Sequence, residues 1–463
     1  MKLGVIDSKF VLTNLRLDGK FHLSEGLEVR RLVKKSPYGY SSIGDVTSDI
    51  YCPGIFRRNY TNSGTPFLGG GDIQKNNYDC GKYLRASTTP NYEILQIKKG
   101  WTLVTCGGTI GDTVFANNLL AKCWLSQHVM RVVPSNIKEG MLYAYLASKY
   151  GHLLLTTNTY GSVIPTLNAS NIQSLPIPKF QEDFQKQVDG LIQEAAQLRE
   201  KAAMDLDEAQ NILKKEANLL ELTVDDYDFY GSSVKGRIVS TFTRPLKSMS
   251  SLTINAFNYS KRIQKLESKI NCQTVPLAEV LENGQFFTTG SFPRIEVEEG
   301  KGIMLINQSD IFDAMIKGKF ISRKGVKTTN MVEYGEVLIA GVGTLGESET
   351  FCRTIFANEE LQGQLVSGEF LRMKTNELIP SGYLYTWLSS DYGFRIIRST
   401  QAGTKLCRPI QKLLLQKPVP IINKAKMEEI DNIVRNAHSL RHQACENERK
   451  AISMVEQEIE KWS

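Results

Sequence analysis

The segment Gly100–Gly111, GWTLVTCGGTIG, recurs 235 positions later as GEVLIAGVGTLG at Gly335–Gly346. A second pair of motifs follows these copies: YLASKYG at Tyr145–Gly151 and WLSSDYG at Trp387–Gly393, 242 positions apart. Solenoid repeats have periods of roughly 20–50 residues, so a period of about 240 indicates a repeated domain. The chain is therefore predicted to contain two copies of one domain.

Weaker matches keep the same order along the chain. The offsets of all the matched pairs stay between 234 and 242, which supports duplication over chance. The additional pairs are Ile43–Val46 with Leu277–Val280, Phe67–Ile73 with Leu305–Ile311, Gly161 with Gly403, Pro176 with Pro418, and Pro178 with Pro420.

Each copy is predicted to be a mixed domain of short strands, turns and short helices, which makes the fold class α+β. Alternating runs predict strands at 101–106 and 129–133. The segment 141–151 predicts a helix that Gly151 closes, and 383–393 predicts its counterpart.

A long helix is predicted after each copy. Residues 181–222 contain one glycine and no proline, and apolar residues recur there at intervals of three and four, as they do in 427–462. This pattern is typical of a coiled coil. At 1.5 Å per residue, about 40 residues form a rod of roughly 60 Å, which exceeds a domain of this size. Pairing of the two helices with one another is therefore favoured over packing of each on its own domain.

The predicted seams contain small residues and two charges. Alanines lie close enough together to let the helix backbones approach, and Arg441 and Glu448 interrupt the second seam, where they could fix the register or meet a partner. The seam alanines are Ala195, Ala202, Ala209, Ala437, Ala444 and Ala451.

The resulting domain plan has five parts. Turn-forming residues and Pro245 mark the segment between the copies as a linker. The predicted parts are a first domain at 1–180, a long helix at 181–222, a linker at 223–251, a second domain at 252–420 and a second long helix at 421–463.

Composition bounds the classes of protein to consider. Of the 463 residues, 41% are hydrophobic and 23% are charged, values that exclude whole-chain disorder, collagen and a pure coiled coil. The net charge of +7 is compatible with a polyanionic partner without proving one. Eight scattered cysteines form no CxxC pair, and no signal peptide or apolar run of membrane-spanning length occurs. We expect a cytoplasmic protein that does not enter a membrane.

No motif for catalysis or cofactor binding is present. The four Gly-Lys pairs are not followed by Ser or Thr, so no phosphate loop of the Walker type exists, and HExxH is absent. His438 and His442 are four residues apart but lack ligand partners at defined spacing, so a solvated helix face is favoured over a metal site. We expect no catalytic residue, metal or cofactor on this chain.

The glycine-rich segments 107–111 and 341–346 have two interpretations. They could lie against a phosphodiester backbone, or they could form a sharp connection within each domain. The second interpretation is favoured.

The ordered set of motifs resembles the DNA-specificity (S) subunit of Type I restriction–modification systems. The resemblance covers nearly the full length, and the second copy departs from it at QSDI and at Arg408-Pro409. The motifs are LRLDGKFH (15–22), GTPFLGGGDI (64–73), GWTLVTCGGTIG, LASKYG, Gly161, LPIP (175–178) and the first helix, then INAFNYS (254–260), LINQSDI, GEVLIAGVGTLG, LSSDYG, Gly403, KPVP (417–420) and the second helix.

The resemblance implies a specific architecture and set of partners. Two target recognition domains would each read half of a split sequence in double-stranded DNA, and two antiparallel spacer helices would separate them. Two methyltransferase subunits, which bind S-adenosylmethionine and methylate adenine at N6, would dock on the chain. Motor-nuclease subunits that use ATP and Mg would join for restriction and phage defence. The chain itself would be non-catalytic.

Basic residues near aromatic ones are the candidates for DNA contact. Arginine can grip guanine O6 and N7, whereas lysine more often supplies charge to phosphates. A solvated basic cluster remains the alternative for each group. The candidates are Arg30, Arg31, Lys34, Lys35, Arg57, Arg58 and Tyr60 in the first copy, and Arg294, Arg323, Lys324, Lys327, Lys405 and Arg408 in the second.

Two functions therefore remain in competition. The first is a reader of a split DNA target within a methylation and restriction complex. The alternative is a coiled-coil scaffold that binds proteins without sequence-specific DNA recognition. An enzyme with an unrecognised site is disfavoured by the missing motifs.

Overall fold

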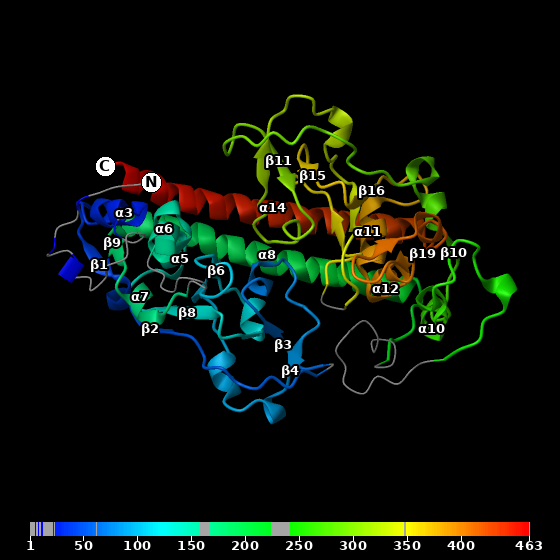
Figure 1. The fold of residues 1–463 in the computed structure, drawn as a ribbon, viewed down its shortest axis with the longest axis horizontal. Coiled ribbons are helices and arrows are strands. Elements are labelled where there is room, and N and C mark those ends of the chain that lie inside the picture. The colour runs from blue at the N-terminus through cyan, green and yellow to red at the C-terminus, as the bar shows by residue number, and fades with distance from the viewer. Residues whose placement is uncertain are drawn as a thin grey trace. The chain divides into compact units, whose positions relative to one another are not determined.

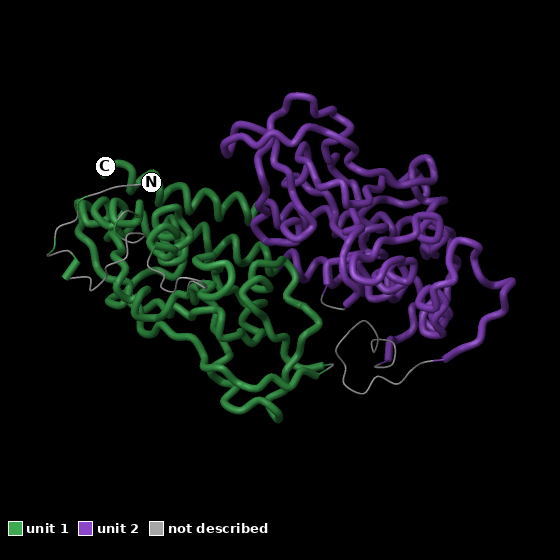
Figure 2. Tube along the Cα trace, viewed as in Figure 1, with its two compact units in different colours: residues 1–200, 443–463 green, residues 201–442 purple. Residues whose placement is uncertain are grey.

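The structure is a computed structural model that describes residues 24–61, 63–157, 166–223, 241–346 and 349–462, together with residues 5, 8, 11, 12 and 22. The described chain forms two compact units (Figure 2). Unit 1 comprises residues 1–200 and 443–463, and unit 2 comprises residues 201–442. Both mix helices with sheets, as the sequence predicts. Most of the motif at 15–22, Gly161 and linker residues 224–240 lie outside the described residues.

The two longest helices are α8 (Glu182–Glu216) and α14 (Lys424–Glu460), labelled in Figure 1. Helix α8 ends before the predicted Leu222 because Asn218 adopts a left-handed conformation with φ of 48°. The N–H of Asn218 donates to Lys215 O (3.1 Å), and the N–H of Leu219 donates to Lys214 O (3.0 Å). These two bonds form a Schellman cap, which satisfies the last carbonyls of the helix.

Unit 1 contains a four-stranded sheet, a three-stranded sheet and a two-stranded pair. The four-stranded sheet has the order β2-β8-β5-β6 and is antiparallel, with Leu103 of β5 opposite Arg131 of β8. The three-stranded sheet, β4-β3-β7, includes one parallel pair, β3 with β7. The strands are β1 (Tyr40–Ser42), β2 (Thr47–Tyr51), β3 (Thr65–Leu68), β4 (Tyr83–Leu84), β5 (Thr102–Thr105), β6 (Thr113–Phe115), β7 (Trp124–Leu125), β8 (Val129–Pro134) and β9 (Pro176–Pro178), which pairs with β1.

The main core of unit 1 joins its larger sheet to the long helices. Val104 and Val132 of the sheet pack with apolar residues from the short helices and from both long helices. Helix α8 contributes Val188, Ile192 and Ala196, and α14 contributes Ala451, Val455 and Ile459. The start of α8 therefore packs in the same core as the end of α14. The shorter helices are α3 (Glu25–Val33), α4 (Ile43–Val46), α5 (Glu139–Ala147), α6 (Lys149–Thr157) and α7 (Ala169–Gln173).

Unit 2 contains two three-stranded sheets and two short pairs. One sheet, β14-β13-β16, is antiparallel, and the other, β12-β11-β15, includes the parallel pair β11 with β15. The strands are β10 (Thr274–Pro276), β11 (Ile303–Ile306), β12 (Lys319–Ile321), β13 (Val337–Ala340), β14 (Thr354–Phe356), β15 (Leu365–Val366), β16 (Phe370–Met373), β17 (Gln401–Ala402), β18 (Arg408–Pro409) and β19 (Pro418–Pro420).

The main core of unit 2 likewise includes both long helices. Ala209 and Leu213 of α8 pack in one cluster with Met427, Ile430 and Val434 of α14. The end of α8 and the start of α14 therefore share this core. The shorter helices of unit 2 are α10 (Lys261–Glu267), α11 (Ser381–Ser389), α12 (Asp391–Arg398) and α13 (Gln411–Leu414).

The glycines of YLASKYG and WLSSDYG do not close a helix, so that prediction is wrong. Each motif spans a junction between two helices, α5 to α6 and α11 to α12, and the glycine lies inside the second helix. A Cβ at Gly151 would overlap Tyr145 O, and one at Gly393 would overlap Trp387 O. The missing side chain therefore allows the second helix to cross directly over the end of the first.

Another glycine lets each short-helix pair dock on a long helix. The N–H of Gly140, in the first turn of α5, donates to Asp189 Oδ1 of α8 (2.7 Å). The N–H of Gly382, in the first turn of α11, donates to Asp431 Oδ1 of α14 at the same distance. Each aspartate satisfies a helix N-terminal donor and complements its positive dipole end.

We expect Gly140→Ala to destabilise unit 1 by about 1–3 kcal/mol because the helices cannot approach as closely. An ideal Cβ at Gly140 would lie 2.8 Å from Ile192 Cβ and 2.9 Å from Asp189 Cα. The matched control is Gly190→Ala in α8, where no heavy atom lies within 4 Å of the new Cβ. The control should stabilise the helix by about 0.5–1 kcal/mol. Urea unfolding of both variants measures the two effects, and equal free energies of unfolding would contradict the tight contact.

His438 is buried rather than solvated, which corrects the sequence prediction for the helix face of His438 and His442. Its ring lies 5.1 Å from that of Phe356 and 5.2 Å from that of Tyr385, centroid to centroid. Burial, aided by the charge of Arg441, holds the pKa of His438 well below its usual range. The histidine is therefore neutral in the fold.

We expect acid to destabilise unit 2 through His438. Its pKa is lowered in the fold, so the neutral ring contributes stability above the unfolded pKa of about 6.5, and that stability is lost as the pH falls below it. The slope should approach 1.4 kcal/mol per pH unit, on the order of one proton. His438→Leu should flatten the pH dependence of urea unfolding between pH 7 and pH 5. The exposed His128→Gln serves as the control, and an unchanged slope in His438→Leu would refute the assignment.

Candidate nucleic-acid interface

The candidates Arg57, Arg58 and Tyr60 lie on an extended segment that follows β2. The Arg58 side chain donates to Gln127 Oε1 (2.7 Å) and its guanidinium lies 5.4 Å from the ring of Phe67 in β3. The ring of Tyr60 lies 6.2 Å from the same phenylalanine, and half of Tyr60 is exposed. Arg57 is also exposed. The segment therefore presents two cationic groups and one aromatic ring over the three-stranded sheet.

Arg30 and Arg31 lie elsewhere in unit 1, on helix α3. The buried face of this helix contributes Val29 and Val33 to the main core, whereas Phe56, next to Arg57, packs in a separate small core with Phe67 and Trp124. Lys34 lies over the ring of Tyr40 at 5.3 Å, and Lys35 is exposed. The two basic clusters of unit 1 therefore lie over different hydrophobic cores.

In unit 2 the structure brings Arg294 together with the segment that holds Arg323, Lys324 and Lys327. The N–H of Ser322 donates to Ile295 O (2.8 Å), and the two segments run antiparallel at this bond. Arg294 and Arg323 are the residues next to the two bonded ones. All four basic side chains are exposed, and the Arg294 guanidinium lies 5.7 Å from the ring of Phe292. These residues form one basic cluster, which we call the 294/323 cluster.

A buried network anchors the 294/323 cluster. The N–H of Lys327 donates to Asn330 Oδ1 (2.8 Å), and the Asn330 amide donates to Thr289 O (2.5 Å). Arg372 of β16 donates to Asn330 O (2.9 Å) and to Met331 O (2.5 Å). It also forms a bidentate pair with Glu336 at 2.8 Å for both bonds, with 1% of either side chain exposed. The loop is therefore held by a residue in the sheet below it.

Sequence reasoning placed Arg131 in the strand at 129–133 without assigning it a role, and it did not single out the counterpart Arg372. Arg131 is fully buried in β8 and donates only to carbonyls of described residues, including Ser126 O (2.9 Å) and Leu125 O (2.6 Å). Burial lowers the pKa of Arg131 to about 10, so it stays charged at neutral pH. The recurrence of arginine in VMRVV and FLRM was the signal that could have identified both.

Lys405 and Arg408 lie on a different element of unit 2, the β17–β18 hairpin. The glycine-rich segment 341–346 packs against this hairpin, since Gly343 and Cys407 exchange two backbone hydrogen bonds of 3.2 and 2.7 Å. Thr344 Oγ1 also donates to Lys405 O (3.4 Å). The loop thus makes a connection within the domain, the favoured interpretation, while Lys405 and Arg408 remain exposed beside it. Residue 161 and its neighbours 158–165, which match this hairpin in the first copy, lie outside the described residues.

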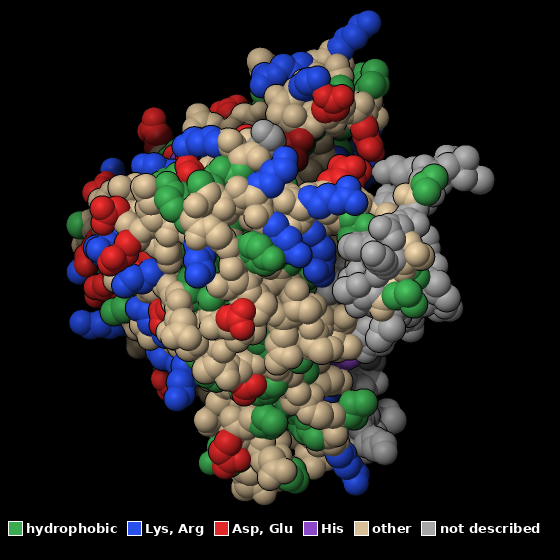
Figure 3. All heavy atoms as spheres, turned by 90° about the vertical axis from the view of Figure 1, so that its left-hand side faces the viewer, with side chains coloured by type: hydrophobic (Ala, Val, Ile, Leu, Met, Phe, Trp, Pro, Cys, Tyr) green, Lys and Arg blue, Asp and Glu red, His purple; other side chains and the backbone are tan. Residues whose placement is uncertain are grey.

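Figure 3 shows lysine and arginine side chains over the upper half of one face, with acidic side chains among them, and a mixture of both at the left edge.

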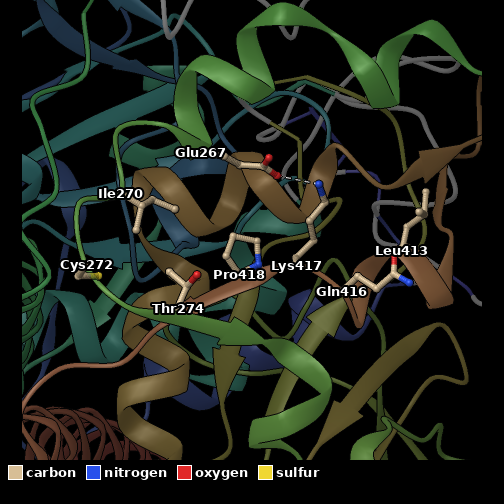
Figure 4. A pocket seen from close by; sticks show the side chains of 8 residues that line it. All are labelled: Glu267, Ile270, Cys272, Thr274, Leu413, Gln416, Lys417 and Pro418. Atoms are coloured by element: carbon tan, nitrogen blue, oxygen red, sulfur yellow. Dashed lines mark hydrogen bonds and ion pairs between the residues drawn. The ribbon is translucent and has the colours of Figure 1, made fainter. Parts of the chain in front are cut away.

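Unit 2 contains a hollow of about 460 Å³ (Figure 4). Glu267 and Lys417 point toward one another across it and form an ion pair of 2.9 Å. Burial raises the pKa of the lining thiol, Cys272, which keeps it protonated and a poor nucleophile. The lining residues are Glu267, Ile270, Cys272, Thr274, Leu413, Gln416, Lys417 and Pro418.

None of the described helices combines the length and hydropathy that crossing a membrane requires.

Several solved structures resemble the chain at low identity. An S subunit of a Type I restriction–modification system from M. genitalium is 12% identical, with 92% of this chain and 96% of that one covered and a TM-score of 0.38. The HsdS subunit from Thermoanaerobacter tengcongensis is 11% identical, with 92% and 99% covered and a TM-score of 0.27. A chain from a study of complex assembly and conformational transition of the type I R-M system is 13% identical, with 91% and 97% covered and a TM-score of 0.27.

No curated protein matches the sequence. Residues 36–193 match a family described as the Type I restriction modification DNA specificity domain. The matched range covers the strands of unit 1, its short helices apart from α3, and the first part of α8, and it confirms the resemblance drawn from the sequence motifs. Residues 36–193 are therefore similar to a Type I restriction modification DNA specificity domain.

Proposed function

We propose that the chain is a sequence-specific DNA-binding subunit that reads a split target, one half with each unit. The observation that carries the proposal is the match of residues 36–193 to a DNA specificity domain, together with a similar strand plan in unit 2, which lies outside that match. A second reader would allow the chain to contact two separated half-sites.

The strand plans support a duplication. The sheet β4-β3-β7, with its parallel pair, has the same order and directions as β12-β11-β15. Arg131 lies opposite Leu103 and Arg372 lies opposite Leu338, so both buried arginines occupy the same place in their sheets. In each copy, the strand that contains the two prolines pairs with a strand from the beginning of the copy. These pairs are β9 with β1 and β19 with β10. We propose that each copy is a target recognition domain.

The long helices would then act as spacers. In unit 1 the start of α8 shares a core with the end of α14, and in unit 2 the end of α8 shares a core with the start of α14. This is the pattern of an antiparallel pair, and the seven-residue spacing of apolar positions is that of a coiled coil. A rigid pair would fix the number of unread base pairs between the half-sites, as dimer geometry fixes half-site spacing in other DNA-binding proteins.

The partners belong to the same proposal. Two methyltransferase subunits that use S-adenosylmethionine would methylate adenine N6, and motor-nuclease subunits that use ATP and Mg would cut DNA. The candidates on this chain would bind DNA and position it, without catalysing a step. Eight cysteines without a disulfide fit a reducing cytoplasm.

Methylome sequencing of cells with and without this chain tests the proposed function. A bipartite motif methylated on adenine should be present only when the chain is expressed. A protein-binding scaffold would leave the methylome unchanged, and this outcome would reject DNA recognition as the function.

We expect replacement of Arg323, Lys324 and Lys327 by alanine to impair recognition of one half-site only. A lost arginine–base contact costs about 1–3 kcal/mol at its position, and lost phosphate contacts weaken all sequences and reduce the salt slope. DNA-binding titrations at several salt concentrations, on targets altered in either half-site, separate the two effects. The control replaces Lys301, Lys412 and Lys424, three exposed lysines of unit 2 that were not singled out as DNA contacts. Equal losses in both variants would mean that the 294/323 cluster acts only through net charge.

A further inference from the structure

Three polar side chains meet between the helices α5, α8 and α14 in unit 1. Arg199 Nη1 of α8 lies 2.5 Å from Glu448 Oε2 of α14, with 15% and 6% of the two side chains exposed. The hydroxyl of Tyr143, on α5, donates to the other oxygen of the same carboxylate. Burial and the neighbouring Glu448 raise the pKa of Tyr143 well above its usual range, so the phenol keeps its proton and acts as the donor. The triad joins three helices at one carboxylate.

The apolar seams do not by themselves select one register. Ala195, Ala202 and Ala209 recur every seven residues on α8, and Ala437, Ala444 and Ala451 do so on α14. All six are at most 1% exposed. If one helix slid by seven residues along the other, small residues would again meet small residues. A seam of this kind packs closely, but it discriminates weakly between registers that differ by one heptad.

The triad discriminates strongly between the same registers. A slip of seven residues would place Arg199 opposite either Val455 or Arg441, and Glu448 opposite either Leu206 or Ile192. Each charge would then be buried against an apolar side chain or a like charge, and neither would keep its partner. A buried charge without its partner is strongly unfavourable, whereas a buried pair adds little to stability over apolar residues of similar size. The triad therefore favours one register without being needed for the strength of the packing.

We propose that Arg199, Glu448 and Tyr143 are positioning residues that fix the axial register of α8 against α14 and fasten the first recognition domain to it. This inference rests on the proposed function, because it explains why the unread gap of the DNA target has one length. Tyr143 links the first recognition domain to the two long helices, because α5, on which Tyr143 lies, also packs in the main core of unit 1. A slip of seven residues would move a helix by about 10 Å, which corresponds to about three base pairs.

The test replaces the ion pair by apolar side chains, Arg199→Met with Glu448→Leu, in the complete complex. Methylome sequencing should find the original bipartite motif together with a second one, undetectable in the wild type, whose gap differs by about three base pairs. Thermal unfolding should show a folded protein whose Tm is lowered mainly because the buried hydroxyl of Tyr143 loses its acceptor. Arg199→Lys, which retains the charge, should keep a single gap.

The matched control is Lys149→Met with Glu460→Leu. This pair has the same spacing of 2.5 Å and also involves α14, but half of each side chain is exposed. It should leave both the gap and the Tm unchanged. Should the first double variant fail to assemble, Arg199→Met with Glu448→Gln carries the same test, because the amide oxygen still accepts from Tyr143.

The outcomes separate this inference from the proposed function. A folded, active double variant with one gap of the original length overturns the register role, while its bipartite motif still supports DNA recognition. Absence of a bipartite motif in the wild-type complex would instead overturn the proposed function itself.

Discussion

Arg372→Met is expected to lower the free energy of unfolding of unit 2 by about 3–5 kcal/mol, because it leaves the carboxylate of Glu336 buried without its partner. The two side chains are only 1% exposed and form two hydrogen bonds of 2.8 Å. The carbonyls of Asn330 and Met331 would lose a donor in the same variant. Urea unfolding followed by tryptophan fluorescence provides the measurement.

The double variant Arg372→Met with Glu336→Leu separates charge from packing. Removing both partners eliminates the unpaired charge, so we expect the double variant to recover a substantial part of the lost stability, although the two carbonyls remain without their donor. If it is as unstable as the single variant, the ion pair is not the source of the effect.

The same substitution should affect DNA binding at one half-site. Arg372 holds the backbone at Asn330, and Asn330 accepts a hydrogen bond from the N–H of Lys327. At a temperature where the variant remains folded, the 294/323 cluster should lose affinity for its half-site without loss at the other. Equal weakening of both half-sites would point to partial unfolding instead.

Lengthening both long helices by seven residues is expected to lengthen the unread gap of the DNA target by about three base pairs. The insertions would lie between Glu200 and Lys201 of α8 and between His442 and Gln443 of α14, which are the boundaries between the two units. Seven residues add about 10 Å and keep the heptad phase, and B-DNA rises roughly 3.4 Å per base pair. The ion pair of Arg199 and Glu448 lies within unit 1 and is preserved.

The extended variant should methylate more slowly than the wild type. Three base pairs also turn the second half-site by about 100° around a helix of roughly 10.5 base pairs per turn, so the DNA or the helices must twist. A seven-residue insertion after Gly300, in an exposed turn of unit 2, provides the control and should leave the gap unchanged. An active helix-extended variant that retains the original gap would refute the spacer role.

The sequence revealed the repeated motifs and the helical seams because both depend on local patterns. The strands at 101–106 and 129–133 are recovered as β5 and β8, and apolar periodicity identified both long helices. The helix end was misplaced because no glycine or proline marks it before Leu222, whereas the left-handed backbone of Asn218 ends the helix. Gly151 was misread because glycine serves equally as a helix stop and as a close-packing site.

The candidate interface was less accessible to sequence reasoning. The pairing of Arg294 with Arg323 depends on a backbone bond between Ile295 and Ser322, far apart in sequence, and the anchoring role of Arg372 depends on carbonyls that no sequence pattern marks. His438 was misjudged for a similar reason, since burial against Phe356 and Tyr385 arises only in the tertiary fold. Which side chains touch bases remains a prediction for every candidate residue.

The separation of cores within each unit has an evolutionary consequence. Phe56 and Phe67, beneath the Arg57 segment, pack in a small cluster of their own, and Phe292 and Val326, beside the 294/323 cluster, pack in another. The long helices contribute to neither cluster. Mutations that alter the proposed recognition loops therefore leave the docking of the helices largely undisturbed, and a lineage can acquire new target preferences while it inherits the same frame. Selection for new DNA targets and selection for the packing of the long helices then act on different residues of one chain.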